Sequence, residues 1–447
     1  MQRVLLLGSG RTCPPLVELL TRDKCVQVTV ASNDASQAES MARSYPNTTA
    51  KHFNLSPDSD LSQLIKDHDL VMSLVPTTLH TIVARQCIDA KTNLVTASYV
   101  SPELASLHDS AQEAGVVIMN ECGLDPGIDH LLAMDCIDNV HKNNGKILYF
   151  ESWCGGLPHS SFAGNPLRYK FSWSPAGVLI AACNPARYLK GGKVVEIPAG
   201  GGIMREVKPM SNGFSTSLPL EGYPNRDSLK YRDLYGIQEA ETVIRGTLRY
   251  QGYCKSVLAL LELGLLDNET MPRLQPDAAD ITWSDLLAML LSRTEVRGSN
   301  LKESVLEALQ GDKEKYQIIQ DLGLLSSTPV SLAGTPLRAL ASHLETMLEL
   351  GPDEYDTVLL QHIVGIENSN STKEEHCITL HMDGDKNGDT AMSKLVGKTA
   401  AIAAKIILSG QYKRKGVQRP LTPDIYEPAL KALQDEGVHY DISVKKM

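Results

Sequence analysis

The sequence predicts an α/β fold with a parallel sheet in the first part of the chain, and two observations carry that prediction. Short apolar runs at residues 4–7, 26–30, 70–75, 94–96 and 116–119 alternate with stretches of helical periodicity. Strands that alternate with helices are typical of βαβ units, whose strands lie parallel. The first apolar run is also followed at once by Gly8-Ser9-Gly10, a pattern that connects a strand to a helix in dinucleotide-binding domains.

The composition excludes several classes of protein. The chain has 447 residues, of which 42% are hydrophobic and 21% charged, and its formal net charge is −10. These values are typical of globular proteins, and an acidic chain lacks the field that attracts nucleic acid or an anionic membrane. The apolar runs are all shorter than the roughly 18 residues of a membrane span, and the nine cysteines contain no CxxC pair. We therefore expect a soluble intracellular enzyme with free thiols and no metal site.

The turn after the first apolar run predicts a cofactor site. Gly8 would permit a tight turn, and Gly10, which has no Cβ, would let a pyrophosphate approach the backbone. The N-terminus of the following helix would supply N–H groups and a partial positive charge. Cys13 replaces the third glycine of the full G-x-G-x-x-G motif, so an ordinary strand-to-helix turn is the alternative interpretation.

The end of the second apolar run indicates which dinucleotide binds. An acidic side chain at this position binds the 2′-hydroxyl of NAD, whereas an arginine accommodates the 2′-phosphate of NADP. The segment Ser32-Asn33-Asp34 contains no basic residue, and Asp34 would repel a phosphate. The sequence therefore favours NAD over NADP. Asp34 would equally serve as a helix N-cap, the commoner role for aspartate at such a place.

Polar residues that follow the later apolar runs are candidates for the reacting centre. In open α/β sheets, ligands bind beyond the carboxyl ends of the strands. Ser98 and Tyr99 follow the fourth run, and the alternative for Tyr99 is simple packing at the sheet edge. Asp125 lies in a glycine- and proline-rich turn before a helix. The spacing supports a role in the active site and a structural role equally. We expect Asp129 to be an N-cap.

Two arginines and one cysteine stand out in the middle of the chain. Arg226 and Arg249 lie in polar segments bounded by glycine, proline or aromatic residues. Arginine binds carboxylates with two parallel hydrogen bonds, although a structural salt bridge is the usual role of a single arginine. Cys154 is either a reactive thiol or, as is more common, an inert buried one.

The pattern changes after about residue 145, and three parts are expected. Strands are predicted at residues 146–152, 193–197, 357–366 and 375–382, a mostly helical stretch at 256–348, and an apolar helix at 391–408. We expect a dinucleotide-binding domain at 1–125 plus 391–447, a mixed α+β substrate-binding domain at 126–255 plus 346–390, and a helical insert at 256–345.

Six motifs, at residues 120–130, 154–158, 165–167, 169–174, 223–228 and 245–250, follow one another in an order and spacing that extend over nearly the whole chain. Together they resemble the glutamate-forming saccharopine dehydrogenases (saccharopine reductases), and most closely the form fused to lysine–ketoglutarate reductase in lysine-degrading animal and plant enzymes. The resemblance implies that saccharopine, NAD+ and water give glutamate and 2-aminoadipate 6-semialdehyde, reversibly and through an imine. It also implies a homodimer, a Rossmann domain completed by the C-terminal helices, and a second reductase domain attached in the parent polypeptide.

The resemblance also implies a set of site residues. The reacting centre would be lined by Tyr99, Asp125 and Cys154. Saccharopine would contact Ser98, Tyr99, Asp125, Arg226, Thr247, Leu248 and Arg249. The dinucleotide would contact Gly8, Ser9, Gly10, Arg11, Thr12, Cys13, Ser32, Asn33, Asp34, Val75, Pro76, Ala97, Ser98, Tyr99, Asp125, Trp173, Ser174, Pro175 and Ala176. Asp125, with Tyr99 and a water molecule, would accept the proton of the substrate amine.

Three other functions stay open at this point. One is an NADP-dependent saccharopine reductase of lysine biosynthesis, and another is a polyamine-forming imine reductase with a more cationic substrate. The third is a non-catalytic dinucleotide sensor or scaffold, against which the full set of site motifs argues. The expected location is the cytoplasm, or the mitochondrial matrix if the chain is a domain of the animal bifunctional enzyme.

Overall fold

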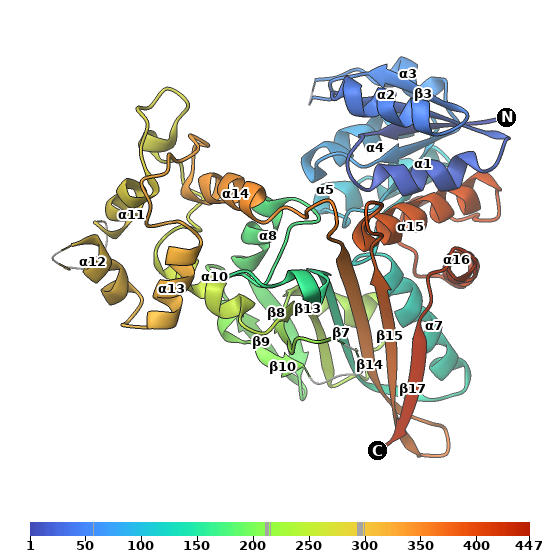
Figure 1. Cartoon of the computed structure of the whole chain (residues 1–447). Coiled ribbons are helices and arrows are strands. Elements are labelled where there is room, and N and C mark those ends of the chain that lie inside the picture. The colour runs from blue at the N-terminus through green and yellow to red at the C-terminus, as the bar shows by residue number, and fades with distance from the viewer. Residues whose placement is uncertain (57, 211–213, 215, 293–297, 299) are drawn as a thin grey trace. The chain divides into compact units, whose positions relative to one another are not determined.

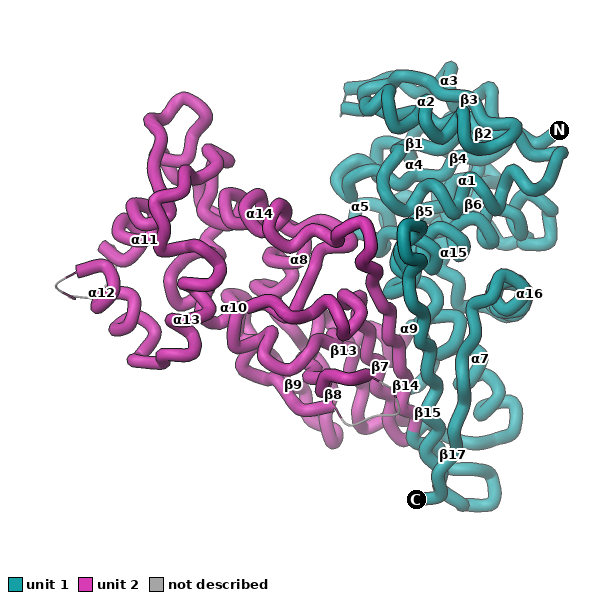
Figure 2. The backbone as a smooth tube through the Cα atoms, in the orientation of Figure 1, with its two compact units in different colours: residues 1–147, 234–237, 365–447 teal, residues 148–233, 238–364 magenta. Residues whose placement is uncertain are grey.

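The computed structural model describes residues 1–56, 58–210, 214, 216–292, 298 and 300–447, and it divides into two compact units (Figure 2). Unit 1 contains residues 1–147, 234–237 and 365–447, and unit 2 contains residues 148–233 and 238–364. Each unit has its own hydrophobic core. The division into three domains that the sequence suggests stays a prediction.

Unit 1 contains the parallel sheet that the sequence predicts. Within the described residues seven strands lie in the order β16-β6-β5-β4-β1-β2-β3, and every pairing between neighbours is parallel. Five of them coincide with the predicted apolar runs. The strands are β1 (Gln2–Leu7), β2 (Val26–Ser32), β3 (Thr48–His52), β4 (Leu70–Ser73), β5 (Asn93–Thr96), β6 (Val117–Met119) and β16 (Gly416–Gln418).

The sequence analysis missed β3 and β16, and each was missed for a physical reason. Strand β3 is a largely exposed edge strand with the sequence TTAKH, so burial imposes no apolar pattern on it. Strand β16 has three residues and comes from the far end of the chain to pair with β6. Such a short strand obtains its stability from the neighbour it pairs with rather than from a local signal.

Unit 1 includes two long helices from the C-terminal region of the chain. Figure 1 draws them in red beside the blue N-terminal elements. Helix α15 (Ala391–Leu408) packs against α1 (Cys13–Thr21) and α16 (Pro423–Asp435), and α16 packs against α7 (Ile128–Lys142). The prediction that C-terminal helices complete the dinucleotide-binding fold is therefore confirmed. The remaining helices are α2 (Ala35–Ser44), α3 (Ser62–Lys66), α4 (His80–Asp89), α5 (Pro102–Ala105) and α6 (His108–Glu113).

Unit 1 also holds β15 (Lys373–Asp383), which pairs antiparallel with β17 (Asp441–Lys446). Under the parallel sheet, side chains such as Leu5, Val71 and Leu94 form a fully buried cluster. Each large aliphatic side chain buried in this way contributes about 1.5–3 kcal/mol to folding. The buried strands hold the loops at the carboxyl edge of the sheet in place.

Unit 2 is built on a mixed sheet, as the sequence predicts. Strands β10, β11, β13, β7 and β14 lie side by side in this order, with β13 antiparallel to β11 and parallel to β7. The strands are β7 (Lys146–Pro158), β8 (Ala186–Lys190), β9 (Lys193–Ile197), β10 (Lys208–Met210), β11 (Leu220–Pro224), β12 (Arg226–Asp227), β13 (Thr242–Tyr250) and β14 (Asp356–Glu367). Strand β13 was not predicted, although it carries Arg249.

The helices of unit 2 between residues 253 and 347 agree with the predicted helical stretch, of which positions 293–297 and 299 lie outside the described residues. The helices at 175–182 and 230–234 were not predicted. Side chains from these helices and from the mixed sheet share one core, which includes Trp283, Leu340 and Leu248. The helices are α8 (Pro175–Ala182), α9 (Lys230–Leu234), α10 (Tyr253–Glu262), α11 (Trp283–Leu291), α12 (Leu301–Ala308), α13 (Lys313–Asp321) and α14 (Pro336–Met347).

Two chemical expectations can be compared with the structure. The nine cysteines all carry free thiols, as the sequence predicts. Across the described part of the chain, no helix combines the length and the apolar character that crossing a membrane requires.

Candidate active site

The loop after β1 has the geometry that a dinucleotide-binding turn requires. Gly8 has φ of +108°, and a Cβ there would lie 2.8 Å from the carbonyl oxygen of Leu74, so only glycine fits. A Cβ on Gly10 would meet no atom within 4 Å, which leaves open space beside this backbone for a pyrophosphate. Helix α15 braces the loop from behind, because the Ser393 hydroxyl donates to the carbonyl of Arg11 at 2.5 Å.

The helix N-terminus contributes less than the sequence analysis expected. Helix α1 begins at Cys13, and Pro14 and Pro15 occupy its next positions, where they have no N–H to donate. Cys13 is itself fully buried, and its N–H donates to the carbonyl of Gly10 at 3.0 Å. Burial raises the pKa of the Cys13 thiol to about 12. The predicted contact between Cys13 and a cofactor stays a prediction.

A cavity of about 520 Å³ lies beside this loop at the carboxyl edge of the sheet. Its lining includes eight of the predicted cofactor contacts: Gly8, Ser9, Gly10, Ser32, Asn33, Asp34, Val75 and Pro76. Sequence reasoning missed the rest of the lining, because part of it follows the unpredicted strand β3. The missed residues are Leu7, Ala31, Gln37, Phe53, Asn54, Leu55, Leu74 and Leu79.

The polar rim of this cavity is organised by hydrogen bonds. The hydroxyls of Ser9 and Ser32 are 2.8 Å apart, and Ser9 donates to the amide oxygen of Gln37 at 3.3 Å. Asp34 is the N-cap of α2 and accepts from the N–H of Gln37 at 2.9 Å, so the alternative role proposed for it is confirmed. Among the described residues that line the cavity there is no lysine or arginine. The rim is therefore polar and carries one carboxylate.

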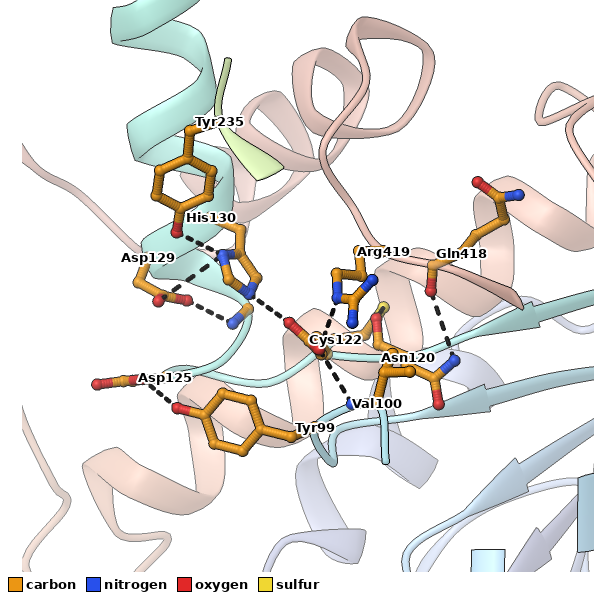
Figure 3. A network of polar contacts seen from close by, with 12 residues as sticks. Tyr99, Val100, Asn120, Cys122, Asp125, Asp129, His130, Tyr235, Gln418 and Arg419 are labelled. Atoms are coloured by element: carbon orange, nitrogen blue, oxygen red, sulfur yellow. Dashed lines mark hydrogen bonds and ion pairs between the residues drawn. The ribbon is translucent and has the colours of Figure 1, made fainter. Parts of the chain in front are cut away.

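Tyr99 and Asp125 meet at the same edge of the parallel sheet (Figure 3). The Tyr99 hydroxyl donates to Oδ1 of Asp125 at 2.8 Å, and both side chains are partly exposed. Tyr99 follows β5, and Asp125 lies in the loop between β6 and α7. Gly127 shapes this loop, because a Cβ on it would lie 2.0 Å from the carbonyl oxygen of Gly123. The prediction that the turn presents Asp125 outward agrees with this geometry.

Asp129 has a different role from the one predicted. The N-cap residue of α7 is Gly127, and Asp129 is the second residue of the helix. Its carboxylate accepts from the N–H of Gly127 at 2.6 Å, and the side chain is fully buried. Asp129 therefore holds the turn from inside the helix instead of capping it. The N-cap prediction was wrong because a glycine with φ of +151° precedes the helix.

A buried group of charged residues adjoins Tyr99 and Asp125. Glu121, which is 1% exposed, accepts from Nε2 of His130 at 2.8 Å and from Nε of Arg419 at 2.8 Å. The Tyr235 hydroxyl is hydrogen bonded to Nδ1 of His130 at 2.7 Å. Burial alone would raise the pKa of Glu121, but the hydrogen bond and charge of His130, the charge of Arg419 and the N–H of Val100 together lower it to about 2.

This pKa predicts an acid-dependent contribution to stability. A carboxylate whose pKa is depressed from 4.5 to about 2 stabilises the native state above pH 4.5, and that contribution is lost as the pH falls toward 2. The difference corresponds to about 3 kcal/mol. Urea unfolding of the wild type and of Glu121→Gln between pH 5 and pH 3 measures it. We expect the free energy of unfolding to fall more steeply in the wild type, and parallel curves would contradict the assignment.

Ser98 is held by a buried histidine. His80 Nε2 lies 2.8 Å from the Ser98 hydroxyl, and its Nδ1 lies 2.9 Å from the hydroxyl of Ser73. Burial lowers the pKa of His80 to about 4, so the ring is neutral at pH 7. A neutral imidazole donates with one nitrogen and accepts with the other, which orients both hydroxyls. Sequence reasoning missed His80, since a histidine at a helix start carries no local signal of such a role.

In unit 2, Arg249 is a buried cation in an aromatic pocket. Its guanidinium carbon lies 4.9 Å from the ring centre of Tyr169 and 5.0 Å from that of Tyr253. Arg249 Nε is buried without a hydrogen-bond partner, whereas its Nη1 donates to the carbonyl of Leu248 at 2.8 Å. Burial raises the pKa of Tyr253 to about 12, so this phenol is neutral at pH 7 and does not balance the charge.

No carboxylate among the described residues forms an ion pair with Arg249. Glu221, whose Cα is paired with that of Arg249, instead accepts from the N–H groups of Gly252 and Cys254 at 3.0 and 2.7 Å. Burying an unbalanced charge costs several kcal/mol. Such a site is suited to an anionic group from a ligand.

Arg226 lies in different surroundings. It is exposed, has φ of +57°, and lines a cavity of about 530 Å³ together with Arg187, Glu196 and Asp227. The structure therefore gives Arg249 a buried setting and Arg226 an exposed one. That the two arginines hold one substrate together stays a prediction.

Most of the remaining predicted residues are also in unit 2. Cys154 is 8% exposed and lies on β7, paired in register with Thr247 of β13. Leu248, between Thr247 and Arg249, is fully buried. Trp173 is 41% exposed, and Ser174 caps α8 by accepting from the N–H of Gly177 at 3.2 Å. The catalytic role of Cys154 and the substrate contacts of Thr247 and Leu248 stay predictions. The same holds for the cofactor contacts predicted for Trp173, Ser174, Pro175 and Ala176, and for Arg11, Thr12 and Ala97 of unit 1.

Known proteins match this chain over nearly its full length. The saccharopine dehydrogenase NADP binding domain matches residues 4–119, and the saccharopine dehydrogenase C-terminal domain matches residues 123–438. The mitochondrial alpha-aminoadipic semialdehyde synthase of Bos taurus is 42% identical over 441 residues, which are 98% of this chain and 47% of that protein. The chain thus spans about half the length of the animal relatives that it matches.

A stand-alone relative and a solved structure cover the chain completely. The saccharopine dehydrogenase (NADP(+), L-glutamate-forming) of Saccharomyces cerevisiae is 38% identical over 450 residues, which are 100% of this chain and 99% of that protein. The structure of apo histidine-tagged saccharopine dehydrogenase (L-Glu forming) from Saccharomyces cerevisiae covers 100% of both chains with a TM-score of 0.89 at 37% identity. The chain therefore belongs to the saccharopine dehydrogenase family of oxidoreductases, with a nicotinamide dinucleotide as cofactor.

Proposed function

We propose that the chain catalyses the oxidation of L-saccharopine by NAD+ and water to L-glutamate and L-2-aminoadipate 6-semialdehyde, in lysine degradation. The observation that carries this proposal is the hydrogen-bonded pair of Tyr99 and Asp125 at the carboxyl edge of the dinucleotide-binding sheet. A carboxylate beside a phenol is suited to accept a proton from a bound amine. Family membership supplies the substrate class, and the similarity to saccharopine dehydrogenase of Saccharomyces cerevisiae supports it.

The residues around the cavity in unit 1 fit a dinucleotide. Gly8 lets the loop approach the backbone of Leu74, and Gly10 leaves its own backbone uncovered by a side chain. The polar rim offers the hydroxyl of Ser32 and the carboxylate of Asp34 to a ribose. When bound, the nicotinamide accepts the hydride. The side chains of the protein bind and orient the substrate and transfer protons.

Saccharopine carries three carboxylates and a secondary amine, and the proposed role of Arg249 is to bind one of those carboxylates. A buried cation with unpartnered N–H is matched by an anionic ligand, which receives charge-assisted hydrogen bonds. Binding of this kind orients the C–N carbon for the reaction. In this proposal Arg226 binds a second carboxylate from its exposed position.

Asp125 has the central proton-transfer role. The substrate amine must be neutral before its neighbouring carbon loses hydride, and Asp125 accepts that proton directly or through a water molecule. The oxidation leaves an imine, to which water adds at the carbon. Cleavage of the C–N bond then releases glutamate and the semialdehyde. The Tyr99 hydroxyl donates to Oδ1 of Asp125 and thereby fixes the carboxylate that accepts the proton.

The test of the function is a spectrophotometric assay of the purified chain with saccharopine and either NAD+ or NADP+. We expect the absorbance of reduced nicotinamide to rise, with the higher kcat/KM for NAD+. No reaction with either dinucleotide would reject the enzymatic proposal. A higher kcat/KM for NADP+ would reject only the cofactor choice.

The second candidate is an NADP-dependent saccharopine reductase that works in the biosynthetic direction. It is favoured by the description of the matching domain as NADP binding and by the NADP(+) in the names of fungal relatives. The lack of a described lysine or arginine in the cavity lining favours NAD instead. A homodimer, attachment to a reductase domain, and a cytoplasmic or mitochondrial location belong to the proposal as well.

Substitution of Asp34 by asparagine tests the choice between NAD and NADP without disturbing the helix. Asparagine caps a helix about as well as aspartate, so the hydrogen bond from Gln37 and the fold are retained. Removal of the negative charge lowers the repulsion of a 2′-phosphate. We expect the ratio of kcat/KM for NAD+ to that for NADP+ to fall by about tenfold, an effect of about 1.4 kcal/mol. An unchanged ratio would show that Asp34 does not face the ribose.

A further inference from the structure

Tyr99 and Asp125 come from two different loops, and one buried carboxylate connects those loops. Oε1 of Glu121 accepts from the N–H of Val100 at 3.0 Å, and the N–H of Glu121 donates to the carbonyl of Ser98 at 3.1 Å. Glu121 therefore binds the backbone on both sides of Tyr99. Figure 3 shows the labelled partners of this carboxylate, Val100, His130 and Arg419, converging beside Tyr99 and Asp125.

The same carboxylate also binds the helix that follows Asp125. Oε2 of Glu121 accepts from Nε2 of His130, which lies in the first turn of α7. A carboxylate only accepts hydrogen bonds, so Nε2 of His130 carries the hydrogen and Nδ1 faces the Tyr235 hydroxyl. Tyr235 is 2% exposed and belongs to residues 234–237, the short segment of unit 1 between two stretches of unit 2.

Arg419 completes the arrangement from the C-terminal region. Its Nε donates to Oε1 of Glu121 at 2.8 Å, and its side chain is 23% exposed. Glu121 is held at φ of +61°, a conformation that costs a non-glycine residue free energy. A buried carboxylate is costly unless its geometry and hydrogen bonds are excellent. Here three donors converge on it, so its position is strictly determined.

We propose that Glu121 is a positioning residue, which fixes the Tyr99 hydroxyl against the Asp125 carboxylate by binding both of their loops. This inference rests on the proposed function, in which Asp125 accepts the proton of the substrate amine. Glu121 is 1% exposed, so it acts through its neighbours and does not touch the reacting atoms. A shift of about 1 Å in a reacting group lowers the rate by about a hundredfold.

The test is Glu121→Gln, with Glu113→Gln, an exposed glutamate of α6, as the matched control. The amide retains the size of the side chain but cannot accept with both of its ends. We expect kcat for saccharopine to fall about 10- to 100-fold, with KM for saccharopine and the fluorescence-measured Kd for the dinucleotide within threefold of the wild type. We expect Glu121→Asp, which keeps the charge but not the reach, to stay equally slow.

Crystal structures of the wild type and of Glu121→Gln provide a readout besides activity. The expected result is a Tyr99–Asp125 hydrogen bond in the wild type that is lost or lengthened in the variant. An unchanged distance, or a variant with the kcat of the wild type, overturns the positioning role. If the wild type has this hydrogen bond but does not oxidise saccharopine, it is the proposed function that fails.

Arg419→Gln provides a second variant, because its partly exposed side chain is replaced with little effect on packing. It removes one donor and leaves His130 and Val100 in place. We expect a smaller decrease of kcat, about threefold to tenfold, again with KM unchanged. A purely structural role of Glu121 predicts instead that kcat of the folded enzyme is unaltered in both variants, whatever their melting temperatures.

Discussion

Replacement of Asp125 by asparagine is expected to lower kcat for saccharopine oxidation by about 10²- to 10⁴-fold, the range that general base catalysis contributes. Asparagine accepts the hydrogen bond from Tyr99 that Oδ1 accepts in the wild type, so the local geometry is retained. It cannot accept the proton of the substrate amine. The KM for saccharopine and the Kd for the dinucleotide are expected to stay near the wild-type values, because the carboxylate is assigned to the reaction and not to binding.

The matched control is Asp109→Asn, since Asp109 is an exposed aspartate in the first turn of α6. It is expected to leave kcat unchanged. Steady-state kinetics of both variants across pH 6 to 10 provide the measurement. If Asp125→Asn retained more than half of the wild-type kcat at every pH, another group would have to accept the proton.

Much of the dinucleotide-binding fold could be predicted because burial imposes a readable pattern. Strands β1, β4 and β5 are buried on both faces, and their runs of valine and leucine are typical of a central parallel strand. The edge strand β3 has no such pattern, and the residues after it, including Phe53, were therefore missing from the predicted cofactor contacts. Because β3 was not predicted, the part of the cavity lining that follows it was not predicted either.

The pair of Tyr99 and Asp125 was predictable for a related reason. Both residues follow apolar runs, and the carboxyl ends of parallel strands meet at one edge of a sheet. The network behind them was not predictable in this way. Arg419 reaches Glu121 from 298 positions away in the sequence, and Tyr235 comes from a segment that no local pattern connects with the sheet. Such contacts depend on tertiary packing, which periodicity does not report.

The arginines of β13 also show that residue type and spacing alone do not predict the role of a side chain. Arg245 and Arg249 are both buried on β13, yet Arg245 stacks on Tyr231 at 4.2 Å, whereas Arg249 lies among Tyr169 and Tyr253. Spacing in the sequence does not distinguish an arginine that stacks on a ring for structural reasons from an arginine that binds an anionic ligand. The absence of an ion pair between Arg249 and a described carboxylate supports the second role for Arg249.

The substitution Arg249→Met tests that role, and two opposite effects are expected from it. Methionine keeps the unbranched apolar stem and removes the charge. The KM for saccharopine should rise about 30- to 1,000-fold, which corresponds to the loss of about 2–4 kcal/mol when one partner of a buried charge pair is removed. The melting temperature should stay equal or increase, because the free enzyme no longer buries an unbalanced cation.

The opposite directions of these effects separate binding from structure. An arginine that only stabilises the fold would lower the melting temperature when replaced and would leave KM unchanged. Arg273→Met is the matched control, since Arg273 is exposed on the surface of unit 2, and it should alter neither quantity. Thermal unfolding with and without saccharopine adds an independent check. The substrate should raise the melting temperature of the wild type and of Arg273→Met, but raise that of Arg249→Met only at far higher concentration, because stabilisation by a ligand depends on the ratio of its concentration to its Kd.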